Sequence, residues 1–450
     1  MKLIIIGAVA GGTSAGAKAR RGDESLEITL YEKDADISYA ACGIPYYIGG
    51  ITDDIEDLIP RTPDDFKSKY NIDVLIKHEV IKINPEDKTI TVKNLIKNEI
   101  FEDHYDKLVV ATGAFSFVPD IQGVDLPHVF NIRTADDAKA LTIFLKKEHP
   151  KKAAIIGTGF IGLEMLENLK ALDIDVTIID NDDKLTPHLD QEMADLLYEK
   201  LKHKAIFMKM EATTKRITKT QIFFDNGESL KTDLVILAVG IRPNTRLAKA
   251  AGILLGGTKA IKVNDKMQTN VEDIYACGDC IETYSLITRK PIYMPLGTTA
   301  NKTGRIVGDI ITGGDISYRG NLKTSIFKIF EYTVAMSGLS MKEATEAGYD
   351  VLKIRHTARN KPKYIGGEKM HIFALADKKS NRLLGVQIIG QEGVDKRIDL
   401  YVVLMTYGIS FKEFFHIDLA YAPPFSNVRD AIHYTGMILE GELKKNDETK

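Results

Sequence analysis

The sequence predicts an α/β protein made of two parallel-sheet domains followed by a C-terminal α+β domain. A strand over 2–6 leads through a glycine turn into a helix over 13–21, and a second strand follows at 27–31. About 150 residues later the same order recurs, with strands at 153–156 and 176–179 around a second glycine turn. Each such βαβ unit is typical of a Rossmann-like fold, so two of them imply two domains of this type.

The rest of the chain supplies closing strands for these sheets and a third domain. Apolar runs at 107–111 and 233–239 end in turn residues and are predicted to close the first and second sheets. Beyond about residue 318 the pattern changes to antiparallel strands and helices, without a further phosphate loop. We expect the charged tail after 441 to be frayed. The predicted elements are strands within 318–339, 370–377 and 382–389 and helices at 340–347 and 396–406.

Composition indicates a folded, soluble protein and argues against two classes of partner. Of the 450 residues, 44% are hydrophobic and 27% charged, and the net charge of −3 gives no basic excess for nucleic acid. No apolar run approaches the ~18 residues of a membrane span. The three cysteines are too few for a disulfide framework, so we expect a reducing, cytoplasmic setting.

The N-terminus has two interpretations. Lys2 and the apolar run after it resemble the start of a short signal peptide. The alternative is a buried first strand that runs into a glycine turn. We favour the strand because a nucleotide site needs the residues that follow it, namely Gly7, Gly11, Gly12 and Glu32.

The second glycine turn predicts a site for NAD(P)H. Glycines let a phosphate approach the backbone at a helix N-terminus, and this turn has all three of them, Gly157, Gly159 and Gly162. Asp180 ends the next strand, where a carboxylate can hold an adenosine ribose. Its charge would repel a 2′-phosphate, so NADH should be preferred and NADPH is possible. A turn role remains the alternative for Asp180, and Glu164 faces the nicotinamide or caps the helix.

The first glycine turn predicts a second nucleotide site, although it departs from the usual fingerprint. Gly7, Gly11 and Gly12 are present, but Val9 occupies the place of the middle glycine. Glu32, with Lys33 beside it, ends the following strand and is well placed for an adenosine ribose.

A second segment assigns a flavin to this first site. The segment 269–279 ends in Gly278-Asp279, and with Thr112-Gly113 it resembles the second flavin-binding signature of two-dinucleotide-binding-domain flavoproteins. That resemblance implies FAD, with Asp279 on its ribityl chain. Gly240, at the end of the other closing strand, is a further predicted cofactor contact. The resulting domains are an FAD-binding domain split between 1–112 and 245–320 and an NAD(P)H-binding domain at 113–244.

Cys42 is the candidate redox residue. It lies in the segment SYAACGIPYYIGG at 38–50, where glutathione- and lipoamide-type reductases carry two cysteines four residues apart. A single cysteine needs an external sulfur or a sulfenic acid to complete a redox cycle. Next to a flavin and a helix N-terminus, its thiol pKa should be depressed. The alternative is an inert buried thiol.

Cys277 and Cys280 have the spacing of a C-x-x-C motif. Their loop is already assigned to FAD through Gly278 and Asp279, and two ligands are too few for zinc. We therefore expect ordinary buried thiols and no metal site.

Several motifs together resemble the coenzyme A-disulfide reductases, in the single-cysteine branch of the pyridine nucleotide-disulfide oxidoreductases. These motifs are GAVAGG, SYAACGIPYYIGG, GTGFIG, YACGDC, GQEGVDKRIDL and DLAYAPPFS. The resemblance covers nearly the whole chain. It implies a homodimer whose interface is the third domain, 321–450, and electron transfer from NADH through FAD to a mixed disulfide between Cys42 and coenzyme A.

The resemblance also carries over individual residues. Cys42 matches the nucleophile, and Tyr421 matches the tyrosine of the partner subunit that protonates the leaving coenzyme A thiolate. Tyr364 resembles a second active-site tyrosine. Related oxidases and peroxidases have a histidine in the first glycine loop, where this chain has Ala10. That difference favours coenzyme A sulfur chemistry, on the disulfide, a persulfide or other mixed disulfides.

The phosphates of coenzyme A require a basic channel, and coenzyme A could be substrate or bound adduct. The candidates for this channel are Arg20, Arg21, Ser38, Lys69, Asn301 and Arg305, with Arg61, Lys67 and Lys302 as further basic residues. One alternative function is an NADH oxidase or peroxidase that uses a Cys42 sulfenic acid. Another is a redox-responsive binding protein without turnover.

Overall fold

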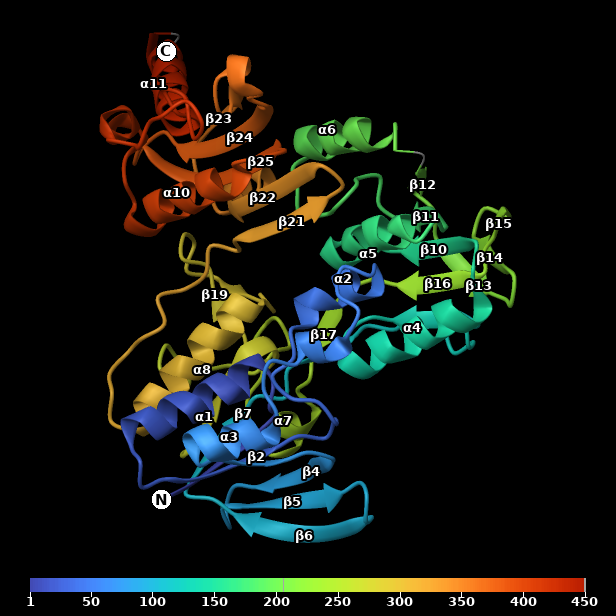
Figure 1. Cartoon of the computed structure of the whole chain (residues 1–450). Coiled ribbons are helices and arrows are strands. Elements are labelled where there is room, and N and C mark those ends of the chain that lie inside the picture. The colour runs from blue at the N-terminus through green and yellow to red at the C-terminus, as the bar shows by residue number, and fades with distance from the viewer. Residues whose placement is uncertain (205, 449–450) are drawn as a thin grey trace.

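The computed structural model describes residues 1–204 and 206–448, and it confirms the predicted fold class (Figure 1). Two parallel sheets form the cores of the first two domains, and an antiparallel sheet with helices forms the third. In Figure 1 the first domain lies at the bottom, the second at the right and the third at the top. No helix within the described residues is long and apolar enough to cross a membrane.

The first domain is built on a five-stranded parallel sheet. Its strand order is β18-β7-β1-β2-β3, so the late strand β18 completes a sheet formed mostly by the first 110 residues. The helices α1 and α8 pack side by side over it (Figure 1). The strands are β1 (Lys2–Ile6), β2 (Glu27–Tyr31), β3 (Asp73–Leu75), β7 (Lys107–Val110) and β18 (Ile274–Ala276), and the helices are α1 (Ala10–Gly22), α3 (Pro63–Tyr70) and α8 (Gly297–Ile311).

The second domain repeats this plan in the order β12-β11-β10-β16-β9. Its strands are β9 (Val129–Asn131), β10 (Lys152–Ile156), β11 (Asp175–Ile179), β12 (Phe207–Lys209) and β16 (Leu234–Leu237), with helices α4 (Ala135–Glu148), α5 (Phe160–Ala171) and α6 (Gln191–Leu201). The chain enters and leaves the domain through a two-stranded ribbon of β8 (Ala114–Ser116) and β17 (Ile241–Pro243), followed by α7 (Arg246–Ala250).

Two small antiparallel sheets accompany these domains and were not predicted. The first domain carries β4 (His78–Asn84), β5 (Thr89–Asn94) and β6 (Glu99–His104), and the second carries β13 (Thr214–Ile217), β14 (Gln221–Phe224) and β15 (Ser229–Lys231). A short pair, β19 (Thr283–Tyr284) and β20 (Pro291–Ile292), precedes α8.

The third domain is an antiparallel sheet in the order β21-β22-β25-β24-β23, packed against α10 and α11. The expected fraying after 441 is wrong as far as Glu448, to which α11 continues, and residues 449–450 lie outside the described residues. The elements are β21 (Ser325–Ile329), β22 (Tyr332–Gly338), β23 (Val351–Arg359), β24 (Lys369–Asp377) and β25 (Arg382–Gly390), with α9 (Met341–Glu346), α10 (Val394–Tyr407), a 3-10 turn at Phe411–His416 and α11 (Ala431–Glu448).

A short helix, α2 (Ile44–Ile48), connects the first domain to the other two. Ile44 and Ile48 are buried in one cluster with Leu163 of α5 and Phe327 of β21. In Figure 1 the helix lies between the first domain and the helices α4 and α5, which it contacts. The segment around Cys42 is therefore anchored at the junction of the domains.

Candidate active site

The first glycine loop closes tightly over the end of β1. Gly7 has φ +103°, and a Cβ there would lie 2.3 Å from the carbonyl oxygen of Ala111. A Cβ on Gly12 would lie 1.9 Å from the carbonyl oxygen of Gly7. Side chains are thus excluded at both positions, and the backbone at the start of α1 stays open to a phosphate.

Glu32 supports this loop from the neighbouring strand. Its carboxylate accepts hydrogen bonds from the backbone N–H of Ala8, at 2.8 Å, and of Asp34, at 3.1 Å. Burial raises the pKa of Glu32, and the two N–H donors oppose that rise. Lys33 is exposed beside it.

The second flavin signature meets the first glycine loop in space. A Cβ on Gly11 would lie 3.3 Å from Cα of Gly278, which itself has φ +82°. Asp279 follows and forms an ion pair with Arg133 at 2.7 Å. Two sequence signatures about 270 residues apart therefore converge on one site, with the glycine cradle and the acidic groups that FAD requires. Arg133 follows β9 without any motif, so the sequence did not predict it.

The residues Thr112 and Gly113 fix the crossing between the first two domains. The hydroxyl of Thr112 donates to the carbonyl oxygen of Asn244 at 2.6 Å, and the N–H of Asn244 donates to the carbonyl oxygen of Gly113 at 2.9 Å. Gly113 has φ +67°, and Gly240 at the other crossing has φ +96°. Both crossings use the left-handed backbone region that favours glycine.

The second glycine loop reproduces the first in detail. Gly157 has φ +110°, and a Cβ there would lie 2.4 Å from the carbonyl oxygen of Ala238, while a Cβ on Gly162 would lie 2.1 Å from the carbonyl oxygen of Gly157. A Cβ on Gly159 would meet no heavy atom within 4 Å in the described part of the chain. Asp180 accepts from the N–H of Thr158 at 2.8 Å, as Glu32 does from Ala8.

Cys42 lies directly before α2 and is exposed in the single chain. The segment that leads to it is tied to the first glycine loop, because the N–H of Ser38 donates to the carbonyl oxygen of Ala8 at 2.9 Å. Ser38 has φ +53°, an uncommon backbone conformation for a residue with a side chain. The cysteine is thus fixed relative to the predicted flavin site.

The charges around Cys42 do not depress its pKa, contrary to expectation. Partial desolvation raises the thiol pKa, the carboxylates of Glu164 and Asp279 raise it further, and Arg133 opposes them. Burial and Glu167 raise the pKa of Glu164 to about 7, while a hydrogen bond from Tyr46 opposes the rise. The sequence singled out Glu164 but not Tyr46, which carries no motif of its own.

Cys277 and Cys280 are both 0% exposed, as expected for ordinary buried thiols. Burial raises the pKa of each, to about 11 for Cys280. Within the described residues, no three His, Cys, Asp or Glu side chains gather as a metal site would require.

The two predicted tyrosines lie on loops of the third domain. Tyr364 is 75% exposed and Tyr421 is 50% exposed. Neither phenol has a hydrogen-bond partner within residues 1–204 and 206–448. Both side chains are therefore free to meet another molecule.

The candidates for coenzyme A binding divide into two groups. The prediction that Arg20 binds coenzyme A is wrong. Arg20 is only 8% exposed, and its guanidinium donates to the carbonyl oxygens of Glu24, Leu26, Tyr70 and Asn71. It connects α1 to α3 and has no face for a substrate. Arg21, Lys69, Asn301 and Arg305 are exposed, and Asn301 donates to Ser14 across the α1–α8 pair at 2.9 Å.

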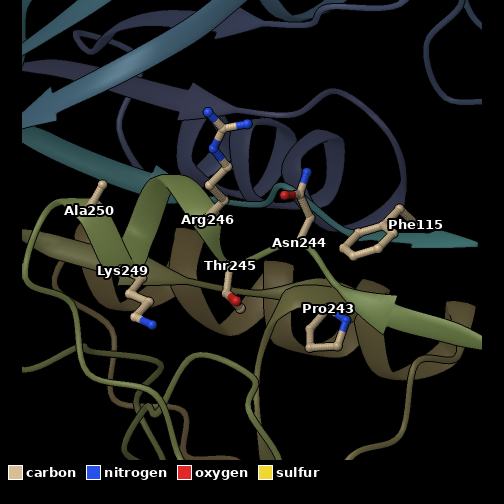
Figure 2. A pocket seen from close by; sticks show the side chains of 7 residues that line it. All are labelled: Phe115, Pro243, Asn244, Thr245, Arg246, Lys249 and Ala250. Carbon is tan, nitrogen blue, oxygen red and sulfur yellow. The ribbon is translucent and has the colours of Figure 1, made fainter. Parts of the chain in front are cut away.

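Two pockets lie outside the cysteine region. One of about 530 Å³ adjoins the β8–β17 ribbon and α7, and none of the predicted site residues is among its lining (Figure 2). Another of about 430 Å³ lies between α8 and α10, and its lining includes Lys302, Arg305 and Arg319.

Comparison with known proteins decides the family. Residues 1–296 match the pyridine nucleotide-disulphide oxidoreductases, and residues 324–432 match their dimerisation domain. The chain belongs to this family. Its members are FAD-dependent enzymes that use NADH or NADPH, and its third domain is the dimerisation domain of a homodimer.

Individual relatives cover the whole chain. A coenzyme A disulfide reductase of Staphylococcus haemolyticus is 35% identical over 97% of this chain and 98% of its own. A CoA-dependent NAD(P)H sulfur oxidoreductase of Pyrococcus furiosus is 38% identical over 98% of this chain and 99% of its own. Among solved structures, reduced CoADR-RHD of Bacillus anthracis has a TM-score of 0.97 at 34% identity, covering 99% of this chain and 81% of the other.

Proposed function

We propose that this enzyme reduces coenzyme A disulfide, or a related coenzyme A persulfide or mixed disulfide, with electrons from NAD(P)H. One observation carries the proposal: of the three cysteines, only Cys42 is accessible, and it has no second cysteine with which to form an internal disulfide. A lone thiol that cycles through a disulfide takes its second sulfur from a disulfide substrate by thiol–disulfide exchange. We place the reaction in the cytoplasm, where free cysteines remain reduced.

The cofactor arrangement supports a route for two electrons to Cys42. FAD, when bound, supplies the two-electron relay between the nicotinamide and a disulfide. We assign the first glycine loop, Glu32, Thr112-Gly113 and Gly278-Asp279 to FAD. We assign Gly157, Gly159, Gly162 and Asp180 to NAD(P)H, and the Asp180 carboxylate favours NADH because it repels a 2′-phosphate.

The substrate step is a thiol–disulfide exchange. The Cys42 thiolate attacks one sulfur of coenzyme A disulfide, which forms a mixed disulfide and releases one coenzyme A thiolate. Tyr421 of the partner subunit donates a proton to that leaving thiolate, and Tyr364 is assigned as the second active-site tyrosine. Reduction of the mixed disulfide by two electrons then releases the second coenzyme A and restores the Cys42 thiolate. The exposure of both phenols supports this role.

Basic groups on the α1–α8 face support recognition of the coenzyme A phosphates. Arg21 of α1 and Arg305 of α8 are exposed there, and Asn301 adds a polar contact next to Ser14. Lys69 is exposed on α3. Guanidinium and ammonium groups bind phosphates by charge and hydrogen bonds.

A second candidate function is reduction of oxygen or peroxide through a Cys42 sulfenic acid. It is favoured by one relative, an NADH oxidase of Methanocaldococcus jannaschii, which is 34% identical over 99% of both chains. Against it stands Ala10, which cannot exchange a proton with a peroxide oxygen as a histidine could.

Steady-state kinetics of Cys42→Ser test the proposal. The variant should keep FAD and still be reduced by NADH, because neither step needs a thiol, and its turnover of coenzyme A disulfide should fall to background. Wild-type enzyme should consume NADH with coenzyme A disulfide under argon and much more slowly with oxygen alone. Normal disulfide turnover by Cys42→Ser, or fast turnover with oxygen only, would contradict the proposal.

A further inference from the structure

The two exposed tyrosines of the third domain lie on separate loops that are closed by side chains. The first loop, 360–368, carries Tyr364. Its base is closed by Asn360, whose side-chain oxygen accepts from the N–H of Glu368 at 2.7 Å. Arg359 also donates to the carbonyl oxygen of Gly367 at 2.6 Å. The position of Tyr364 thus depends on how residues 359 and 360 are held.

The second loop, 417–430, carries Tyr421 and is closed by His433. Its Nε2 donates to the carbonyl oxygen of Ile417 at 2.9 Å, and its Nδ1 accepts from the N–H of Asp430 at 3.1 Å. These two partners require the tautomer that is protonated at Nε2. Inside the loop, the hydroxyl of Ser426 donates to the carbonyl oxygen of Ala420 at 2.8 Å, directly before Tyr421.

Arg397, in the first turn of α10, joins the two loops. The residue is 1% exposed, and its Nη2 donates both to the Asp430 carboxylate at 2.6 Å and to the carbonyl oxygen of Asn360 at 3.0 Å. Nη1 donates to the carbonyl oxygen of Gly393 at 3.2 Å. One guanidinium therefore holds the base of the Tyr364 loop, the base of the Tyr421 loop and the start of its own helix.

Asn427 provides a second, smaller connection between the loops. Its side-chain N–H donates to the carbonyl oxygen of Arg359 at 2.8 Å. Both connections end on consecutive carbonyl groups, those of Arg359 and Asn360. The end of β23 is thereby fixed to the Tyr421 loop at two points.

We propose that Arg397, assisted by Asn427, is a positioning residue that fixes Tyr364 and Tyr421 relative to one another for the disulfide reaction. This inference rests on the function proposed above. A buried ion pair stabilises a fold no better than a well-packed apolar pair of similar volume. A planar guanidinium with five donors in a rigid fork does supply fixed geometry, which an apolar pair cannot. Each loop bears an exposed phenol, so that geometry has a functional target.

The test separates positioning from stability by using variants that leave no buried charge without a partner. Arg397→Met combined with Asp430→Asn removes both charges and keeps an acceptor oxygen for the N–H of Ile432. Asn427→Ala removes the smaller connection and buries no unpaired charge. The matched control is Asp377→Asn. Asp377 is a buried carboxylate at the end of β24 away from the Tyr364 loop, and it accepts a hydrogen bond from the N–H of Ser380.

Two acceptors are compared in the holoenzyme, coenzyme A disulfide and ferricyanide, which takes electrons from the reduced flavin without a proton from tyrosine. The double variant should lose about tenfold or more in kcat with coenzyme A disulfide, as expected when a proton donor is misplaced. Asn427→Ala should lose less, and ferricyanide turnover should match wild type in both. Arg397→Lys should be intermediate, because an ammonium cannot reproduce the fork. Asp377→Asn should match wild type with both acceptors.

Combination with Tyr421→Phe completes the test. If Arg397 acts through Tyr421, the two effects should not multiply. The loss of kcat with coenzyme A disulfide in the combined variant should be smaller than the product of the losses in the double variant and in Tyr421→Phe. Multiplying losses, or wild-type disulfide turnover in the double variant or in Asn427→Ala, would overturn the positioning role while leaving the proposed function intact. Wild-type turnover by Tyr421→Phe alone would overturn the positioning role and the proton donation by Tyr421, and would leave the reduction of coenzyme A disulfide through Cys42 to the test of Cys42→Ser.

Discussion

At the scale of single residues, the electrostatics of Cys42 differ from what its sequence context suggested. Proximity to a helix start was expected to favour the thiolate, but α2 has only five residues, and two carboxylates act on the thiol in the opposite direction. The charge that the chain itself supplies in favour of the thiolate is that of Arg133. Glu164 is the side chain whose charge can switch near neutral pH, because burial raises its pKa to about 7.

Replacement of Glu164 by glutamine should lower the pKa of Cys42. Above pH 7 the wild-type carboxylate becomes charged and raises the thiol pKa, and glutamine keeps a hydrogen-bond acceptor for Tyr46 without that charge. We expect the apparent pKa for alkylation of Cys42 by iodoacetamide to fall. Cys42→Ser, which should not react because the other two thiols are buried, is the control. An unchanged or higher apparent pKa would mean that Glu164 does not act on the thiol.

At the scale of elements, sequence patterns predicted those helices, strands and turns that are determined by residues close together in the sequence. Both glycine loops were predicted because a strand, a turn without side chains and a helix follow one another within about 20 residues. β23 was missed although it has the apolar–polar alternation of a half-buried strand, with Leu352 and Ile354 buried and Lys353 and Arg355 exposed. Arg20 was misassigned because a basic residue type does not say which partners it meets, and its partners lie on α3 and after α1.

Residues that act through tertiary contacts could not be predicted either, because a residue type does not show which partners it meets in the fold. Arg133 meets Asp279 across 146 positions of sequence, and Arg397 meets Asp430 and Asn360 across 33 and 37. None of these pairs has a characteristic spacing. The sequence gives the type of each side chain, and only the fold brings them together.

The two glycine loops provide a matched pair of element-scale variants. Gly7→Ala and Gly157→Ala introduce the same strain, since each would place Cβ within 2.4 Å of a carbonyl oxygen at positive φ. Such strain costs about 1–3 kcal/mol. Gly7→Ala should be purified with less FAD per chain. Gly157→Ala should retain FAD and show a KM for NADH raised by about tenfold or more. Flavin content from the absorption spectrum and NADH titrations measure the two effects, and equal loss of FAD in both variants would contradict the assignment of the loops.

At the scale of the whole molecule, the active site is expected to be shared between subunits. The third domain is the dimerisation domain, and it carries Tyr421 and Tyr364 on exposed loops. Cys42 lies in the first domain, beside the α2 junction. A phenol hydroxyl can donate its proton to a departing thiolate.

Mixed dimers should reveal this shared site. A Cys42→Ser chain and a Tyr421→Phe chain, each strongly impaired alone, should regain activity when they are co-expressed with different affinity tags. Random pairing makes half the dimers mixed, and each mixed dimer has one intact site. The activity of the unseparated mixture should therefore approach roughly a quarter of wild type. Purified mixed dimers without activity above the parents would place Tyr421 in its own chain or outside the reaction.

The central claim, that Cys42 exchanges disulfides with coenzyme A, is tested most directly by intact mass. Wild-type enzyme is incubated with coenzyme A disulfide, freed of excess reagent and weighed by mass spectrometry with and without dithiothreitol. We predict a gain of one coenzyme A per chain that dithiothreitol or NADH removes, and no gain in Cys42→Ser. A wild-type chain that gains no coenzyme A, or an equal gain in Cys42→Ser, would contradict the claim.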